Sequence, residues 1–291
     1  MKVILTGSSG FLGSHLKGFF QNKGIEVLCL NYRPETEPEF LAKALSALTQ
    51  GDVLAFLNAG ASQLSGDDPD SLRNLTASNI YLPAAVASLI LKHSPLTHFI
   101  HFGSSWQIGR DGAPSPLNAY AATKSAAESL LEHFVLSGLK AASLRLFDTY
   151  GPGDSRKKVI NLVADALLQD TELPMSNAEQ VVDMVYITDV LAAVDHTIEL
   201  LRSHPVDHLR RYSVRSGRLF RILDIVALMK VLSGKPTFSK IQLGVYPYRS
   251  RERFHLPPAT DFPPNWHPIV SLEEGLKNIL ADRGLPMSQS A

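Results

Sequence analysis

The amino-acid sequence predicts an α/β fold in which a doubly wound parallel sheet is followed by a small C-terminal part. Short apolar runs alternate with helical periodicity through the first half of the chain, a pattern typical of such a sheet. A glycine-rich turn directly follows the first apolar run. After Gly151-Pro152-Gly153 the alternation loosens, and proline and aromatic residues gather in residues 245–264. That later segment is expected to form loops around a ligand.

Five apolar runs are predicted to be strands, with helices between them. The predicted strands are residues 2–5, 26–30, 53–57, 98–102 and 141–147. The predicted helices are residues 11–22, 40–48, 78–92 and 120–137. A later piece, with a strand at residues 185–187, a helix and a strand at residues 211–214, is predicted to return to the main sheet.

Composition and charge exclude several classes of protein. The chain has 291 residues, of which 45% are hydrophobic, so it can bury a sizeable core. Lys+Arg and Asp+Glu are both 28, which leaves no overall field for nucleic acid. The single cysteine excludes an internal disulfide, and the ten histidines show no ligand spacing, so no metal site is predicted. Without a basic leader or a run of ~18 apolar residues, a cytoplasmic protein with no membrane segment is expected.

The glycine-rich turn has the spacing of a phosphate-binding loop. Gly7, Gly10 and Gly13 stand at i, i+3 and i+6 between a strand and a helix. The first glycine allows a tight turn, the second a close approach of the backbone to a pyrophosphate, and the third close helix packing. The helix N-terminus adds free N–H groups. The sequence therefore predicts a Rossmann-like site for a dinucleotide.

The end of the second predicted strand bears on which dinucleotide binds. A carboxylate there would favour NAD by accepting from the ribose hydroxyl, and a basic residue would favour NADP. The chain has neutral Asn31 and, two residues later, Arg33, which can pair with a 2′-phosphate. NADP is therefore the predicted cofactor and NAD the alternative, in which Arg33 is a solvated turn residue.

Tyr120 and Lys124 stand four residues apart at the start of a long predicted helix, on one face. A nearby ammonium is expected to lower the pKa of the phenol and to prepare Tyr120 for proton transfer to a carbonyl oxygen. Ser104 and Ser105 end the preceding strand, and their hydroxyls are expected to bind the same oxygen.

These motifs together resemble the extended short-chain dehydrogenase/reductases, the epimerase/dehydratase family. The resemblance includes the glycine turn, Asn58-Ala59-Gly60, a serine before YxxxK, and Tyr150-Gly151-Pro152. Residues 103–107, 146–152 and 156–158 further resemble bacterial nucleotide-sugar 4-ketoreductases such as the CDP-abequose and CDP-paratose synthases.

By position, the resemblance implies Tyr120 as general acid/base, Lys124 as its partner and Ser104 as the catalytic serine. The cofactor-binding residues that we expect from the turn, the strand ends and the resemblance are Gly7, Ser9, Gly10, Phe11, Leu12, Gly13, Asn31, Arg33, Asn58, Ala59, Gly60, Asn79, Tyr120, Lys124 and Phe147. The expected substrate-binding residues are Ser104, Ser105, Arg249 and Arg251.

By its spacing, Arg249 best matches the family arginine that binds the substrate diphosphate, and Arg251 is the second choice. The alternative is that this basic loop is solvated. The cluster 156–158 could likewise face phosphate or lie on the surface, and the surface is the favoured interpretation. The change of pattern after Gly153 predicts a dinucleotide-binding domain at residues 1–153, to which residues 186–215 return. Residues 154–185 and 216–291 are then the substrate-binding part.

Three departures from the family pattern carry information. Ser105 and Trp106 stand where the sugar 4,6-dehydratases have an acidic pair, so dehydration is disfavoured. Only one helix fits between residues 30 and 53, so the strand that usually flanks the adenine is expected to be missing or short. Asp148 stands where many relatives have an asparagine near the substrate phosphates.

The sequence leaves three functions open. The first is an NAD(P)H-dependent reductase of a nucleotide-linked 4-keto-6-deoxy sugar, with hydride going to C4. The second is an NAD-dependent nucleotide-sugar 4-epimerase. The third is a non-catalytic dinucleotide-sensing protein, which would not need the Tyr120–Lys124 pair. A nucleotide sugar is the expected partner, nucleic acid and membrane are not, and a homodimer is among the assemblies left open.

Overall fold

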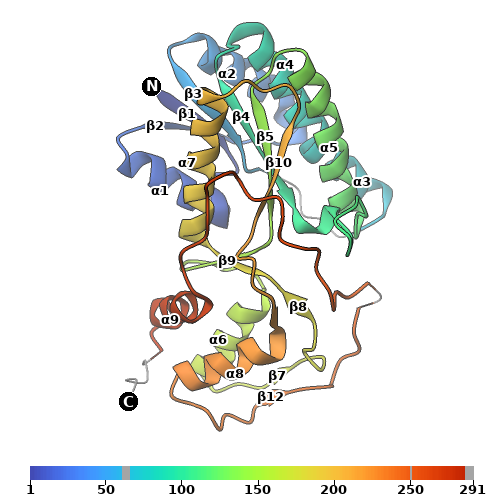
Figure 1. Cartoon of the computed structure of the whole chain (residues 1–291), viewed down its shortest axis with the longest axis vertical. Coiled ribbons are helices and arrows are strands. Elements are labelled where there is room, and N and C mark those ends of the chain that lie inside the picture. The colour runs from blue at the N-terminus through green and yellow to red at the C-terminus, as the bar shows by residue number, and fades with distance from the viewer. Residues whose placement is uncertain (61–65, 250, 286–291) are drawn as a thin grey trace. The chain divides into compact units, whose positions relative to one another are not determined.

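The structure, a computed structural model, describes residues 1–60, 66–249 and 251–285 of the chain. Contacts divide the chain into two units (Figure 1). Unit 1 comprises Met1–Leu146, Leu191–Val214 and Thr260–Trp266; unit 2 comprises Phe147–Val190, Arg215–Ala259 and His267–Ala291. The predicted boundaries at residues 153, 186 and 215 did not include the return of Thr260–Trp266 to unit 1. The dinucleotide-binding and substrate-binding roles of the two parts remain predictions.

Unit 1 is built on a six-stranded sheet with the order β10-β5-β4-β3-β1-β2. Its strands are β1 (Lys2–Thr6), β2 (Glu26–Leu30), β3 (Val53–Asn58), β4 (His98–Ser104), β5 (Ala141–Leu146) and β10 (Arg210–Val214). Every neighbouring pair is parallel, which confirms the predicted fold class. In the described part of the chain β2 is the edge strand, so the strand expected to be missing beyond it is indeed absent from the sheet.

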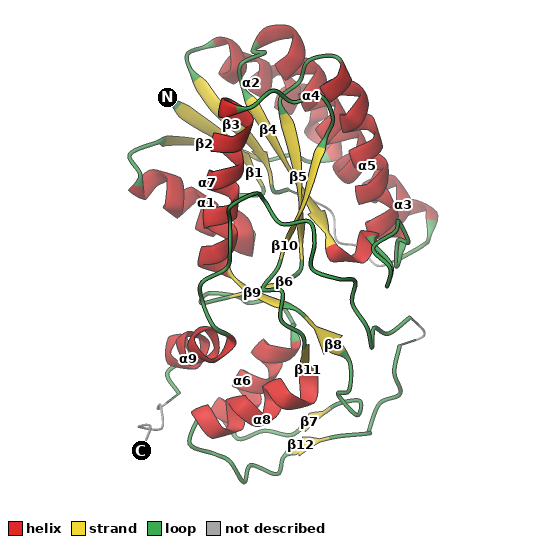
Figure 2. Cartoon of the chain, in the orientation of Figure 1, coloured by secondary structure: helices red, strands yellow, loops and turns green. Residues whose placement is uncertain are grey.

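Helices cover both faces of this sheet (Figure 2). One face carries α1 (Phe11–Asn22) and the unit 1 part of α7 (Ile187–Ser203); the other carries α2 (Glu37–Thr49), α4 (Leu82–His93) and α5 (Ala119–Leu136). On the second face the helices bury one apolar stripe each against the strands. The core residues there include Ile4, Phe40, Phe56, Val86, Phe99 and Leu131. Each such side chain contributes roughly 1.5–3 kcal/mol by burial, which holds the helices on the sheet.

The helix before β4 differs from its prediction. The helical stretch Pro69–His93 consists of α3 (Pro69–Thr76), a π-helical turn (Ala77–Tyr81) and α4, so the predicted start at residue 78 is wrong. Asp68 caps the stretch by accepting from the N–H groups of Asp70 and Ser71 at 3.1 and 3.0 Å, and Pro69 fits the first helical position.

By length and composition alone, the same stretch is long and apolar enough to cross a membrane. Its α4 part, however, buries Leu82, Val86 and Ile90 in the core under the sheet. Core helices of globular proteins meet the same criterion, and the packing of α4 fits that explanation.

Unit 2 is a set of short strand pairs and three helices. β6 (Asp148–Tyr150) pairs with β9 (Met184–Tyr186), β8 (Val181–Val182) with β11 (Phe220–Arg221), and β7 (Leu173–Pro174) with β12 (Ile241–Gln242). The helices are α6 (Val159–Gln169), α8 (Ile222–Leu232) and α9 (Leu272–Asp282). The strand predicted at residues 185–187 therefore pairs within unit 2, and only the strand predicted at 211–214 joins the main sheet.

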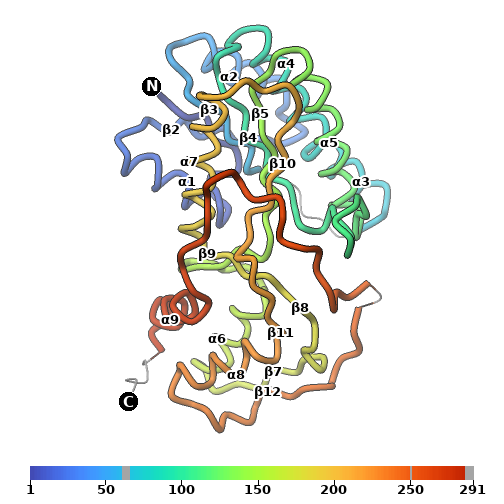
Figure 3. Tube along the Cα trace, viewed as in Figure 1, coloured from blue at the N-terminus to red at the C-terminus, as the bar shows by residue number. Residues whose placement is uncertain are grey.

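The chain trace returns to unit 1 once more near its end (Figure 3). In the segment Thr260–Trp266, the carbonyl oxygen of Asp261 accepts from the N–H of Ser213 at the end of β10, at 2.5 Å. His196 of α7 contacts the carbonyl oxygen of Pro264 at 2.6 Å. These contacts extend the edge of unit 1 without adding a strand among the described residues.

Candidate dinucleotide and proton-transfer site

The glycine turn and the end of β3 lie in direct contact. Gly7 has a φ of +70°, and a Cβ there would lie 2.6 Å from the Cα of Gly60. A Cβ on Gly13 would collide with the carbonyl group of Gly7, whose oxygen also accepts from the N–H of Gly10 at 3.0 Å. β1 and β3 are neighbours from which the chain winds in opposite directions, the place where open α/β sheets bind ligands. The structure thus brings together the predicted Gly7-to-Gly13 turn and Ala59-Gly60.

A buried chain of polar groups holds this arrangement. The hydroxyl of Thr6 donates to Asn58 Oδ1 at 3.0 Å and accepts from the N–H of Gly60 at 3.1 Å. Asn58 Nδ2 lies 3.5 Å from Nδ1 of His101 on β4. Side chains at the two glycine positions would fill the cradle, so a backbone-lined pyrophosphate site fits these residues.

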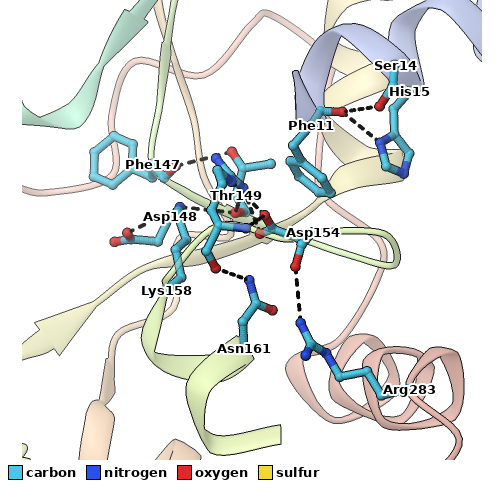
Figure 4. A network of polar contacts seen from close by, with 11 residues as sticks. Phe11, Ser14, His15, Phe147, Asp148, Thr149, Asp154, Lys158, Asn161 and Arg283 are labelled. Carbon is cyan, nitrogen blue, oxygen red and sulfur yellow. Dashed lines mark hydrogen bonds and ion pairs between the residues drawn. The ribbon is translucent and has the colours of Figure 1, made fainter. Parts of the chain in front are cut away.

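The remaining turn residues lie at the start of α1. Ser9 is exposed, and Phe11 and Leu12 are half-buried. The carbonyl oxygen of Phe11 accepts from the hydroxyl of Ser14 at 2.9 Å and contacts Nδ1 of His15 at 2.8 Å (Figure 4). Gly10, the N-cap of α1, has no side chain to cap the helix, so the helix begins directly at the glycine turn.

The predicted cofactor-selecting residues, Asn31 and Arg33, are both exposed after β2. Between them Tyr32 packs edge-on against Phe40, with ring centroids 5.3 Å apart. Burial and the nearby carboxylates of Glu37 and Glu35, together with Tyr81, raise the pKa of Tyr32 to about 12. Acidic and basic groups therefore share this edge of the sheet, a feature that the sequence argument for NADP did not include.

Tyr120 and Lys124 stand in the first turns of α5. Asn118 caps this helix by accepting from the N–H of Ala121 at 3.0 Å. The ammonium of Lys124 lies 6.0 Å from the centroid of the Tyr120 ring. The structure thus confirms that both side chains lie on one face, next to each other.

The prediction that Lys124 lowers the phenol pKa is wrong for this structure. Burial raises the pKa of Tyr120 to about 12, because a tyrosinate would lose hydration. Burial also lowers the pKa of Lys124 to about 8, and the charge of Glu128 acts in the opposite direction. Tyr120 is consequently a protonated phenol at neutral pH and has a proton to donate.

Ser104 ends β4 at the loop that faces α5. Its hydroxyl accepts from the N–H of Trp106 at 3.2 Å, and its own N–H donates to Oε1 of Gln107 at 2.7 Å. Ser105 is buried in the short 3₁₀ helix that follows (Ser105–Gln107). Trp106 packs edge-on against Tyr120 with ring centroids 6.4 Å apart, so the serine loop and the tyrosine are neighbours.

Asn79 reaches the same helix from the π-helical turn. Its amide nitrogen donates to the hydroxyl of Thr123 at 3.1 Å, and that hydroxyl donates to the carbonyl oxygen of Tyr120 at 2.8 Å. Asn79 is fully buried, and π-helical turns often occur at functional sites. Asn79 thus supports the Tyr120 helix, whereas its predicted contact with the cofactor remains a prediction.

Two buried polar residues of this site were missed from the sequence. Glu128 lies one turn beyond Lys124 and contacts Arg145 of β5 and the hydroxyl of Ser143. Gln107 accepts from Ser104 as described. The i, i+4 spacing of Lys124 and Glu128 was available as a signal, but the contact with Gln107 depends on how β4, β5 and α5 meet.

Phe147 and the predicted arginines lie in unit 2. Phe147 is buried under the guanidinium of Arg215, 4.2 Å from its ring centroid. Arg249 and Arg251 are exposed on their loop. Arg253, which was not predicted, is half-buried. Burial lowers its pKa, the charge of Asp148 raises it and the charge of Arg251 lowers it further.

Asp148 lies in a group of charged residues (Figure 4). Its carboxylate is 4.0 Å from the ammonium of Lys158, and burial raises its pKa against the effect of Lys158. Arg156 donates to Asp154 at 2.7 Å and to the carbonyl oxygen of Thr149 at 3.0 Å. The interpretation of residues 156–158 as plain surface is therefore wrong for Arg156 and Lys158, which are half-buried, and right only for Lys157.

The fold and the cradle between β1 and β3 define a dinucleotide-binding α/β protein with a tyrosine–lysine pair. The chain belongs to the NAD dependent epimerase/dehydratase family, whose sequence profile matches residues 3–210. No group of three His, Cys, Asp or Glu side chains in the described part of the chain is placed to hold a metal ion.

Known proteins similar to the chain carry out different reactions. The chain is 28% identical over 208 residues to the CDP-abequose synthase of Yersinia pseudotuberculosis, covering 67% of this chain and 72% of that protein. Its fold is similar to the UDP-glucose 4-epimerase of Thermotoga maritima with UDP-glucose (TM-score 0.82, 21% identity, 98% and 99% coverage). It is also similar to the UDP-glucuronic acid 4-epimerase of Bacillus cereus with UDP-glucuronic acid and NAD (TM-score 0.78, 20% identity, 98% and 100% coverage). At such identities the solved structures bear on the fold alone.

Proposed function

We propose that this chain is an NADPH-dependent reductase of a nucleotide-linked 4-keto-6-deoxy sugar, with NADH as the alternative reductant. The observation that carries the proposal is the placement of Tyr120 beside Lys124 and next to the Ser104 loop, where Ser105 and Trp106 stand in place of an acidic pair. Similarity to a CDP-abequose synthase supports a sugar bound to CDP, and dTDP is the other candidate nucleotide.

A reduced nicotinamide held at the glycine turn would supply the hydride for C4 of the sugar. The phenol of Tyr120 gives its proton to the ketone oxygen, so that the C4 carbonyl becomes an alcohol. The hydroxyl of Ser104 donates to the same oxygen and orients it. The side chain of Lys124 lies beside the Tyr120 ring, and the phenol recovers its proton from water.

Charged residues of unit 2 support an anionic substrate. Lys158 and Arg253 face Asp148, and Arg249 and Arg251 lie on the adjacent exposed loop. Arginine pairs with phosphate oxygens in a bidentate manner, which suits a nucleotide diphosphate. We place the reaction in the cytoplasm, where reduced dinucleotide would be the co-substrate.

An NAD-dependent nucleotide-sugar 4-epimerase is the second candidate. It is favoured by the carboxylates of Glu35 and Glu37 beside Tyr32, because negative charge at that edge disfavours a 2′-phosphate. An epimerase would use the same Tyr120, Lys124 and Ser104, but it would return the hydride to the same sugar.

Cofactor stoichiometry separates the two functions. The purified chain is mixed with NADPH or NADH and with CDP- or dTDP-linked 4-keto-6-deoxyhexoses, and absorbance of the reduced nicotinamide is followed. A reductase oxidises one reduced dinucleotide per ketone. An absence of oxidation with every such ketone, together with interconversion of two C4-epimeric nucleotide sugars, would establish the epimerase instead.

A further inference from the structure

The loop that carries Ser104 is closed by a single buried amide. Oε1 of Gln107 accepts from the N–H of Ser104 at 2.7 Å, and the Ser104 hydroxyl accepts from the N–H of Trp106, which completes a reciprocal capping box. Gln107 is only 1% exposed. A Cβ on Gly103 would lie 2.6 Å from Gln107 Oε1, so the glycine in β4 leaves the room that this amide oxygen occupies. The direction of the chain at Ser104 therefore depends on Gln107.

The other side of this amide meets a buried carboxylate of α5. The carboxylate of Glu128 accepts from the hydroxyl of Ser143 at 2.7 Å and from two guanidinium nitrogens of Arg145 at 3.1 and 2.5 Å. Although burial raises the pKa of Glu128, Arg145, Ser143 and Gln107 lower it below its ordinary value. The amide nitrogen of Gln107 is buried and faces this carboxylate, whose pKa it helps to lower.

Glu128 is on the same helix as the proton-transfer pair. Tyr120, Lys124 and Glu128 follow one another at intervals of four residues, so they share one face of α5. The carboxylate is tied to β5 through Arg145, and it meets the Ser104 loop through Gln107. The position of Ser104 relative to this face of α5 is consequently set by the side chains of Gln107 and Glu128.

We propose that Gln107 and Glu128 are positioning residues that hold the Ser104 hydroxyl in register with Tyr120 and Lys124. This inference rests on the proposed function, in which those three residues bind the ketone oxygen. Neither Gln107 nor Glu128 takes part in proton transfer. Their effect is geometric, and misplacement of a catalytic group by about 1 Å can reduce a rate by ~10²-fold.

Glu128 also influences the charge of Lys124. The groups that face Lys124 are Tyr120 and Glu128 on α5 and His101 on β4, whose pKa is held well below its ordinary value by burial and by Lys124. His101 is therefore neutral, and Glu128 is the group that favours the ammonium form of Lys124. In a variant that lacks the Glu128 carboxylate, Lys124 should lose its proton at a lower pH than it does in the wild type.

The test uses two variants and one matched control. Gln107→Met removes the acceptor for the Ser104 N–H with little change in side-chain size. Glu128→Gln removes the buried charge. Glu132→Gln, the control, lies one turn further along α5, where its carboxylate accepts from Arg211 at 2.8 Å and from the N–H of Leu209 at 3.2 Å.

We expect kcat on the ketone substrate to fall by about 10- to 100-fold in Gln107→Met and Glu128→Gln, with KM and dinucleotide affinity nearly unchanged. Glu132→Gln should keep the wild-type kcat. The alkaline limb of the kcat profile should move to lower pH in Glu128→Gln but not in Gln107→Met, because only the former removes a charge that faces Lys124.

A second readout is independent of the substrate. Trp106 packs on Tyr120, so near-ultraviolet circular dichroism reports the placement of the Ser104 loop on α5. A Trp106→Phe variant identifies the relevant band. Gln107→Met should diminish this band while thermal unfolding stays cooperative. Glu132→Gln should leave the band unchanged.

Wild-type kcat together with an unchanged Trp106 band in Gln107→Met would overturn the proposal. So would equal losses of kcat in Glu128→Gln and Glu132→Gln. If the wild type reduces no nucleotide-linked ketone, the proposed function fails, and the circular dichroism still decides whether Gln107 places the loop.

Discussion

Burial of Lys124 predicts a variant that is more stable and less active. A charged lysine has lost its hydration at this position, and each pKa unit corresponds to about 1.4 kcal/mol. A pKa lowered from 10.5 to about 8 therefore makes the folded state about 3 kcal/mol less stable at pH 7 than it would be with a solvated lysine. We expect Lys124→Met to recover most of this, because its thioether chain fills the same space without a charge. Glu128 keeps Arg145 and Ser143 as partners in that variant.

The gain should depend on pH in a defined window. The folded lysine loses its proton near pH 8 and the unfolded one near pH 10.5, so wild-type stability rises between these values as the penalty disappears. The advantage of Lys124→Met should therefore be full at pH 7 and small above pH 10.5. Each kcal/mol of this gain should raise the Tm by roughly 2–4 °C.

Tryptophan fluorescence during urea unfolding suits this measurement. Trp106 and Trp266 are the two tryptophans of the chain, and both lie in unit 1 with Lys124. Lys43→Met on the exposed side of α2 is the control and should leave the free energy of unfolding nearly unchanged. A Lys124→Met protein that is less stable than wild type at pH 7, or whose gain persists undiminished at pH 10.5, would refute the reasoning.

Three further predictions concern the cradle and the reaction. Tyr120→Phe should lower kcat by ~10²–10⁴-fold at nearly unchanged dinucleotide affinity, measured by fluorescence titration; a wild-type kcat would contradict its role as acid. Arg33→Asp should weaken NADPH binding and leave NADH binding comparatively unaffected, whereas a wild type that prefers NADH tenfold would show that Arg33 pairs with no phosphate. Gly13→Ala should destabilise the fold by about 1–3 kcal/mol and weaken dinucleotide binding, because its Cβ collides with Gly7. Gly18→Ala, in open space on the same helix, should instead stabilise by up to about 1 kcal/mol in the same denaturation series.

Features encoded by local spacing could be predicted from the sequence. The glycine turn, the parallel strands and the shared face of Tyr120 and Lys124 follow from residues close together in the chain, and the structure has each of them. The missing strand beyond β2 followed from chain length alone. The early start of the helix at Pro69 was overlooked, although Asp68-Pro69 is an N-terminal signal of ordinary type.

Properties that depend on burial could not be predicted in the same way. Spacing placed an ammonium near Tyr120, but it said nothing about the loss of hydration that raises the phenol pKa to about 12. Likewise Arg156 looked like a solvated cation until its turn brought it onto the carboxylate of Asp154. The contact of Gln107 with Ser104 and Glu128 needs three elements in register, which no single segment encodes.

The π-helical turn at Ala77–Tyr81 separates two helical segments that differ in how much they bury. In α3 the single buried side chain is Leu75, whereas α4 buries five residues, among them Leu82 and Val86. Local opening requires little free energy where few apolar contacts are lost. Amide hydrogens of α3 should therefore exchange with solvent faster than those of α4, with the step at the π-turn. Asn79 lies in this π-turn. The side chain that supports the Tyr120 helix therefore stands between α3, which should open readily, and α4, which should open only when the core unfolds.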